Sequence, residues 1–410
     1  MFDSEQKLRH LPFFEELATK DEGEATWRAA MAGLVTLRLV DSWLDDGPAI
    51  TADDSWSLRS VLSAIEDIED GSPVRALLTS VAASLLQQRP DIHVVVTPLM
   101  AYARTLEYDA RWLLATDVYQ TVLAHLHPTE DSDASIAAHL RLGQCYRTLG
   151  RLDDAVGAYA SAGKIASAVD DMVGVLRARM GEGNIAMLRG NLPEAEQILD
   201  ETISRATGTS LRDVRGRAMH ERANLPHSRG QYELAIRFAY EALEHSGLAA
   251  DRDRILGDIA VSFLELGVYT AARDAYLVLS ATAQEQYTRW GATLNLLEIA
   301  SRTGAEPLFE LYRRQLSSRD LPPYMATAFA LATGFGYQRF GNRARARAHF
   351  EGALQIAGAH GYNQYLFEAE GALSTLDAPT PPQQVSAKVS LELEEVAGAL
   401  QGMRESAGVS

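Results

Sequence analysis

The chain has 410 residues, of which 47% are hydrophobic, and a formal net charge of −17. This acidic balance argues against nucleic acid as the main partner, because proteins that bind nucleic acids present basic surfaces. The single cysteine, Cys145, excludes an internal disulfide framework. The N-terminal residues lack the apolar core of a signal peptide, and no stretch approaches the ~20 apolar residues that span a bilayer, so we expect a cytoplasmic protein.

Residues 1–91 have apolar side chains at helical spacing, but they do not follow the repeat that begins further along the chain. We expect helices near 24–45, 54–70 and 73–88, with Asp45-Asp46-Gly47-Pro48 as a break. Three of the five tryptophans concentrate apolar area here: Trp27, Trp43 and Trp56. We therefore interpret residues 1–91 as an N-terminal helical cap region.

Six glycines recur every 37 to 40 residues, and Ala110 extends the series by one step toward the N-terminus. They are Gly150, Gly190, Gly230, Gly267, Gly304 and Gly341. A fixed period of this size indicates a solenoid of stacked repeats. Each repeat holds two amphipathic stretches, and glycine permits the positive φ that often ends a helix. The pattern predicts pairs of helices over residues 92–376, with a tight turn at each glycine.

Small and aromatic residues keep fixed offsets from these glycines. In the clearest copy they are Gly143, Tyr146, Gly150, Ala155, Tyr159 and Ala162, and in the last copy Gly334, Tyr337, Gly341, Ala346, Phe350 and Ala353. The copy at Gly267 has Ala260, Phe263, Ala272 and Tyr276, whereas the copy at Gly304 has Phe309 where alanine belongs. The pattern resembles the tetratricopeptide repeat (TPR). The resemblance implies an all-α fold, a right-handed α-solenoid of about seven TPR-like helical hairpins between the N-terminal cap and a C-terminal helix.

The C-terminal part of the chain leaves the repeat pattern. Residues 377–388 are rich in proline and predict a linker. Residues 389–404 predict an amphipathic helix, whose apolar residues repeat in a short heptad seam: Val389, Leu393, Val396, Leu400 and Met403. Three alternatives stay open for this helix. It packs on the last repeat, it detaches to bind a partner, the groove or a second copy of the chain, or it is disordered.

In tetratricopeptide-repeat proteins, defined positions on the first helix of each repeat line a concave groove, and the resemblance assigns those positions here. Three consecutive repeats then carry an amide at the same position: Gln144, Asn184 and Asn224. An amide offers both a donor and an acceptor, so it can hydrogen-bond the backbone of an extended peptide. The series is similar to the asparagines with which many peptide-binding members of the family hold a ligand.

The same positions hold more positive than negative charge. They carry seven arginines, Arg104, Arg147, Arg177, Arg217, Arg254, Arg302 and Arg339, and three glutamates, Glu107, Glu265 and Glu298. Because arginine pairs carboxylates bidentately, a basic groove favours a protein or peptide partner with acidic or carboxylate groups. The candidate binding residues are Gln144, Arg147, Arg177, Asn184, Arg217, His220, Asn224, His227 and Arg254. The alternative is a solvated polar face without a ligand.

Catalytic, cofactor and metal motifs are weak. The segment His220-Glu221-Arg222-Ala223-Asn224 has asparagine where the second histidine of a metalloprotease helix would stand. His220 and His227 share one helical face, but no third metal ligand is in register. Gly181 and Gly183 lie within a helical repeat and not after a strand, which tells against a nucleotide-binding loop. We therefore expect a protein that is not an enzyme and has no cofactor and no metal.

These observations favour a non-catalytic, cytoplasmic scaffold that binds a protein or peptide through a basic, amide-lined groove. One alternative is a regulatory module that senses a ligand or peptide through the same groove. Another is a self-assembling structural subunit that uses the C-terminal helix. Ligand-induced compaction would favour the sensor, and concentration-dependent growth of the particle mass would favour assembly.

Overall fold

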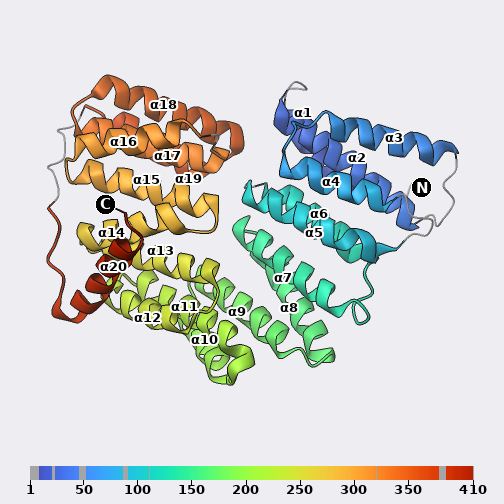
Figure 1. Cartoon of the computed structure of the whole chain (residues 1–410), viewed down its shortest axis with the longest axis horizontal. Coiled ribbons are helices and arrows are strands. Elements are labelled where there is room, and N and C mark those ends of the chain that lie inside the picture. The colour runs from blue at the N-terminus through green and yellow to red at the C-terminus, as the bar shows by residue number, and fades with distance from the viewer. Residues whose placement is uncertain are drawn as a thin grey trace. The chain divides into compact units, whose positions relative to one another are not determined.

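The computed structural model describes residues 9–20, 24–45, 52–85, 91–109, 111–319, 321–377 and 385–409. Helices account for all of the regular secondary structure in these ranges, as Figure 1 shows. The chain divides into two compact units, Met1–Arg189 and Gly190–Ser410, and each has its own apolar core. The all-α architecture predicted from the repeats is confirmed.

The first unit holds these helices in its described residues: α1 (Leu11–Thr19), α2 (Ala25–Asp45), α3 (Ala52–Glu66), α4 (Pro73–Ser84), α5 (Ile92–Tyr108), α6 (Trp112–His125), α7 (Ser132–Thr148), α8 (Leu152–Ala168) and α9 (Met172–Leu188). Helices α2, α3 and α4 match the three expected in the cap, and α1 is an addition. Trp43 is buried and Trp27 half-buried. The Trp56 side chain, Ala110 and most of the expected break after Asp45 lie outside the described residues. The cap boundary at residue 91 stays a prediction.

The second unit holds these helices in its described residues: α10 (Leu192–Arg205), α11 (Arg212–Ser228), α12 (Tyr232–His245), α13 (Ala249–Glu265), α14 (Tyr269–Thr282), α15 (Gln286–Arg302), α16 (Glu306–Ser317), α17 (Pro323–Arg339), α18 (Arg343–His360), α19 (Asn363–Ser374) and α20 (Glu394–Ser406). Single 3₁₀ turns, η1 (Thr209–Leu211) and η2 (Leu391–Leu393), precede α11 and α20. In the described part of the chain, no helix has the length and apolarity needed to cross a bilayer.

Every glycine of the repeat series lies between two helices and has a positive φ, from 71° at Gly230 to 77° at Gly190. At the first turn, the backbone N–H of Arg151 donates to the carbonyl of Tyr146 at 2.9 Å, which satisfies a carbonyl that the end of α7 would leave unpaired. The same bond closes the turns at Gly230, Gly267, Gly304 and Gly341. The predicted turns are confirmed, because only glycine adopts this conformation without steric cost.

Aromatic rings from the second helices fill the space that small residues leave on the first helices. A Cβ atom added to Gly181 of α9 would lie 2.5 Å from the ring of Tyr159, and one added to Gly143 of α7 would lie 2.8 Å from the same ring. Tyr159 is therefore held between two helices that can approach it only because both residues lack a side chain. Gly334 gives the same room to Phe350. The residues expected in the core are buried, as predicted: Tyr146, Ala155, Tyr159, Phe263, Tyr276, Tyr337, Ala346 and Phe350.

The repeat at Gly304 departs from the motif for a reason that the packing explains. Phe309, which stands where alanine is expected, is completely buried. Its ring faces Gly336 of α17, where an added Cβ atom would collide with it. The larger side chain on α16 therefore fits because the facing residue of α17 has no side chain.

The C-terminal helix is docked, but on α14 and not on the last repeat. Figure 1 shows α20, in dark red, beside α14. The seam residues Leu393, Val396 and Leu400 are buried in the core of the second unit, and Val389 and Met403 pack against it in part. Residues 378–384 of the expected linker lie outside the described residues, so the linker boundaries stay predictions.

Candidate functional site

In the first unit, the candidate residues lie on α7 and α9, which pack against each other. Asn184 of α9 is only 6% exposed, and its Oδ1 atom is buried without a hydrogen-bond partner among the described residues. The Nε atom of Arg147 on α7 is also buried without a hydrogen-bond partner among the described residues. Gln144 accepts a hydrogen bond from Arg141 Nη1 at 3.3 Å, and Arg177 is half-buried on α9. Arg147 Nε and Asn184 Oδ1 are therefore a donor and an acceptor without partners in the described part of the chain, and Ser135 Oγ and His139 Nδ1 of α7 are buried in the same way.

The acidic member of this region, Glu107 of α5, is not a solvent-exposed charge. It is 8% exposed, and the Tyr119 hydroxyl donates to its Oε1 atom. Arg141 Nη1 lies 3.5 Å from its other carboxylate oxygen. Burial raises the pKa of Glu107, and the nearby Arg141 opposes that shift. Glu107 thus holds α5, α6 and α7 together and contributes little negative charge to the surface.

In the second unit, three of the four candidate residues of α11 contact side chains of α13. Arg217 Nε donates to Asp251 Oδ2 at 2.6 Å, and Arg254 pairs with the other oxygen of the same carboxylate. His220 Nε2 lies 2.5 Å from Asp258 Oδ2. His227 Nδ1 lies 3.0 Å from Ser262 Oγ. Asn224 contacts Glu221 of its own helix through Nδ2 at 3.5 Å, and its amide is half-buried.

The expected basic character of these positions is reduced by two residues that the sequence interpretation did not include. Asp251 and Asp258 lie seven residues apart on α13, and therefore on one face of that helix. Asp251 is 3% exposed and serves both Arg217 and Arg254. Their spacing was visible in the sequence, but their pairing depends on the register of α11 against α13. Around α11 and α13 the positive charge is largely compensated.

Arg302, Arg339 and Arg147, all from the expected basic set, differ in their contacts. Arg302 donates from Nε to Glu298 Oε1 at 2.9 Å on the same helix. Arg339 donates to Ser301 Oγ at 2.8 Å, and among the described residues it has no carboxylate partner. Burial lowers the pKa of Arg339, and the charge of Arg302 lowers it further. Arg147 likewise has no carboxylate partner in the described part of the chain. Excess positive charge therefore remains near Arg147 and Arg339.

The two histidines considered as metal ligands point to α13 and not to a common centre. His220 faces Asp258, whereas His227 faces Ser262 and contacts the ring of Tyr232 edge-on. Across the described ranges, no group of three or more histidine, cysteine or acidic side chains could hold a metal ion. The geometry gives no support to a shared metal site.

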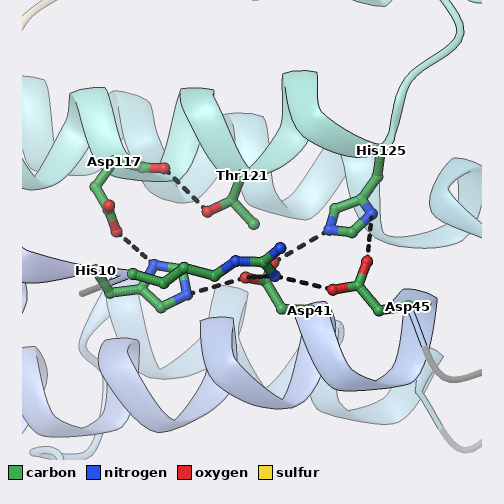
Figure 2. A network of polar contacts seen from close by, with 7 residues as sticks. His10, Asp41, Asp45, Asp117, Thr121 and His125 are labelled. Atoms are coloured by element: carbon green, nitrogen blue, oxygen red, sulfur yellow. Dashed lines mark hydrogen bonds and ion pairs between the residues drawn. The ribbon is translucent and has the colours of Figure 1, made fainter. Parts of the chain in front are cut away.

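A polar network in the first unit has no counterpart in the sequence interpretation. His10 Nδ1 lies 2.7 Å from Asp117 Oδ2 on α6, and its Nε2 lies 3.4 Å from Asp41 Oδ2 on α2. Asp41 also accepts from Arg9 at 2.9 Å and contacts His125 Nε2 at 3.1 Å (Figure 2). The network fastens the start of α1 to α2 and α6. His10 and Asp117 are 107 residues apart in the chain, so no local spacing could reveal the pair.

The charge state of this network follows from its burial. Burial alone would lower the pKa of His10, but hydrogen bonds to Asp117 and Asp41 outweigh it and raise the pKa to about 9. Burial opposes ionisation of Asp41, yet contacts from His10 and His125 hold its pKa below the ordinary value. The His10 backbone is left-handed, with φ of 61°, which is unusual for a residue other than glycine. The contacts of the imidazole ring hold this conformation in place.

Comparisons with known proteins give a structural likeness only. No protein-family profile and no curated protein sequence matches the chain. The Rap conjugation gene regulator of the plasmid pLS20, solved in complex with the Phr* peptide, has a TM-score of 0.51 and 11% identity, over 85% of this chain and 97% of that one.

The quorum sensor NprR from B. thuringiensis, in its apo form, has a TM-score of 0.45 and 12% identity, over 84% of this chain and 92% of that one. Aspartyl phosphate phosphatase F from Bacillus subtilis has a TM-score of 0.45 and 13% identity, over 80% of this chain and 93% of that one. One of these structures is named for an enzyme, and a shared fold does not decide catalysis. The paired helices, the glycine turns and the aromatic rings that fill the glycine sites show that this chain has the tetratricopeptide-repeat fold.

Proposed function

We propose that the chain is a cytoplasmic, peptide-sensing regulatory module whose first helices bind an extended peptide or protein segment. The observation that carries the proposal is that α7 and α9 bury polar atoms without a hydrogen-bond partner among the described residues, and that Arg147 Nε and Asn184 Oδ1, both at candidate positions, are two of them. Each buried polar atom without a partner costs about 1–3 kcal/mol. A ligand that supplies both partners recovers that cost on binding.

A peptide backbone has the chemistry that these atoms lack. Each peptide unit offers one N–H donor and one carbonyl acceptor. The Asn184 oxygen would accept from the N–H, and the Arg147 guanidinium would donate to the carbonyl or to a carboxylate. Because such contacts address the backbone, they hold an extended segment whatever its side chains are. Gln144 and Arg177 lie on the same two helices and add polar groups to this surface.

Electrostatics favours a ligand with acidic or carboxylate groups at Arg147, which has no counter-charge among the described residues. The remaining candidates, Arg217, His220, Asn224, His227 and Arg254, lie on α11 and α13, where Asp251 and Asp258 already compensate charge. There, a ligand would have to compete with contacts that the chain makes with itself. A regulatory role is therefore favoured over a passive scaffold, because such competition changes how α11 and α13 are held. The Rap regulator of similar fold was solved with a peptide, which supports a peptide as the ligand class.

The proposal is tested with a randomised peptide library panned on the immobilised full chain, followed by calorimetric titration of the enriched peptides. Asn184→Ala is expected to weaken binding by about 1 kcal/mol, roughly fivefold in Kd, without lowering the midpoint of thermal unfolding. Arg147→Ala is expected to weaken binding more at low than at high salt, because the Arg147 side chain is only partly buried and salt screens its charge. Arg179→Ala removes the same charge from α9 at a position outside the candidate set and should leave Kd unchanged. Failure to enrich any peptide, or an unchanged Kd in both Asn184→Ala and Arg147→Ala, would overturn the proposal.

Sensor and scaffold are then distinguished by small-angle scattering with the enriched peptide. A change in the radius of gyration on saturation supports the sensor, and an unchanged radius supports the scaffold. Self-assembly through the C-terminal helix is the remaining alternative. Since Leu393, Val396 and Leu400 are buried within the chain, assembly through this seam requires undocking of α20. A particle mass that grows with concentration, and no longer does so when residues 383–410 are deleted, would establish that alternative.

A further inference from the structure

The C-terminal arm, residues 385–409, connects two neighbouring helix pairs of the second unit. These are the pair α11–α12 and the pair α13–α14. The arm consists of an extended stretch, η2 and α20. Its extended stretch follows α19 in sequence, but it lies over the turn of the pair α13–α14. There the backbone N–H of Ala387 donates to the carbonyl of Gly267 at 2.8 Å.

Helix α20 of the arm packs against α14. Leu393 is 1% exposed and Leu400 is completely buried, so together they place two large side chains in the core of the second unit. Arg404 Nη1 donates to Asp274 Oδ1 at 3.1 Å near the other end of α20. Asp274 is itself only 7% exposed, so this ion pair is shielded from water. These contacts fix both the position and the direction of α20 on α14.

The arm also contacts the preceding pair. Helix η2 packs against α12, and Arg237 of α12 donates to Glu392 Oε2 at 3.2 Å. Arg237 and Asp274 occupy equivalent positions, each seven residues after its turn glycine, yet they carry opposite charges. The arm presents the Glu392 carboxylate to Arg237 and the Arg404 guanidinium to Asp274. This charge complementarity fits the arm to these two repeats in one orientation.

On the first helices, the same two pairs are joined by side chains. Arg217 contacts Asp251, His220 contacts Asp258 and His227 contacts Ser262, each contact running from α11 to α13. The second helices, α12 and α14, are joined by the arm. Helices α12 and α13 also pack against each other, so the two pairs share one core. A rotation of one pair against the other would therefore strain both sets of contacts.

From this arrangement we infer that the C-terminal arm is a regulatory strap, which is energetically coupled to the α11–α13 side-chain contacts. Release of the arm loosens the contacts on α11, and their disruption loosens the arm, because coupling between two sites is reciprocal. A ligand that competes for Arg217 or His220 would then be sensed at α20. The coupling itself is a property of the free chain and does not require that any peptide binds.

Hydrogen–deuterium exchange of the full chain, read by mass spectrometry, tests the coupling in both directions. In the first direction, Leu400→Ala combined with Arg404→Ala undocks the arm. We expect exchange of α20 to accelerate, and exchange of α11 to accelerate on the order of tenfold as well. Helix α11 is the informative reporter because it packs against α10, α12 and α13. Gln401→Ala alters an exposed residue of the same helix and should change neither rate.

In the reverse direction, Arg217→Ala combined with Asp258→Ala removes two of the three contacts between α11 and α13. The expected result is faster exchange of α20, with unchanged exchange of α7 in the other unit. Arg404→Asp alone places two carboxylates opposite each other and should release the arm. Adding Asp274→Arg restores an ion pair of reversed polarity and should redock it. The inference is overturned if arm variants affect only α20 and α14, or if the α11–α13 variant leaves α20 unchanged.

Discussion

Replacing Gly181 by alanine tests how aromatic rings hold neighbouring repeats together. The new Cβ atom would lie 2.5 Å from the Tyr159 ring, about 1 Å inside ordinary van der Waals contact. The ring cannot simply retreat, because Gly143 of α7 also lies against it, close to the same ring atoms. Tyr159 is 5% exposed, so there is no solvent-filled space to receive it.

Two opposing effects set the magnitude of the change. Alanine is favoured over glycine within a helix by about 1 kcal/mol. Overpacking of a well-filled core costs about 1–3 kcal/mol, and the close approach of both helices to the ring puts this site near the upper end. We expect Gly181→Ala to lower the free energy of unfolding of the first unit by about 1–2 kcal/mol.

The matched control is Gly157→Ala on α8, where nothing lies within 4 Å of the added Cβ atom. This variant keeps the propensity gain without the clash, so its free energy of unfolding should rise by about 0.5–1 kcal/mol. Urea denaturation followed by circular dichroism measures both changes. In a Tyr159→Leu background the penalty at residue 181 should largely disappear. Stabilisation by Gly181→Ala as large as that by Gly157→Ala would refute the packing argument.

Two further predictions follow from burial and from the pKa of His10. Phe263→Ala empties a fully buried site in the second unit and should cost about 3–5 kcal/mol in urea denaturation, while a loss below about 1 kcal/mol would mean that the ring is dispensable. Because the pKa of His10 rises from 6.5 to about 9 on folding, its contribution to stability is complete below pH 6.5 and is lost as the pH rises through 9. That contribution is at most about 3 kcal/mol. It should appear as faster hydrogen exchange of α1 at alkaline pH, and a His10→Asn variant that keeps the same pH dependence would contradict the assignment.

The repeat architecture could be predicted from the sequence because it depends on properties of neighbouring residues. A glycine that ends a helix with positive φ is a one-residue property, so the period of Gly150 to Gly341 located the turns directly. The buried aromatics were equally accessible, because burial of Tyr159 or Phe350 follows from helical spacing within one repeat. Even the irregular repeat at Gly304 could be located, although Phe309 could not be explained without its neighbour Gly336.

Whatever depends on contact between distant segments was decided by the tertiary structure. The arginines of the candidate site were found from the repeat register, but Asp251 and Asp258 became their partners only when α11 packed against α13. The seam of α20 was visible as a heptad, yet its docking on α14 depends on contacts between distant segments, such as that of Arg404 with Asp274. His10 and Asp117 illustrate the limit most clearly, since 107 residues separate two side chains 2.7 Å apart. A sequence specifies its turns and its apolar faces locally, whereas pairing between polar groups is fixed by the distances that packing creates.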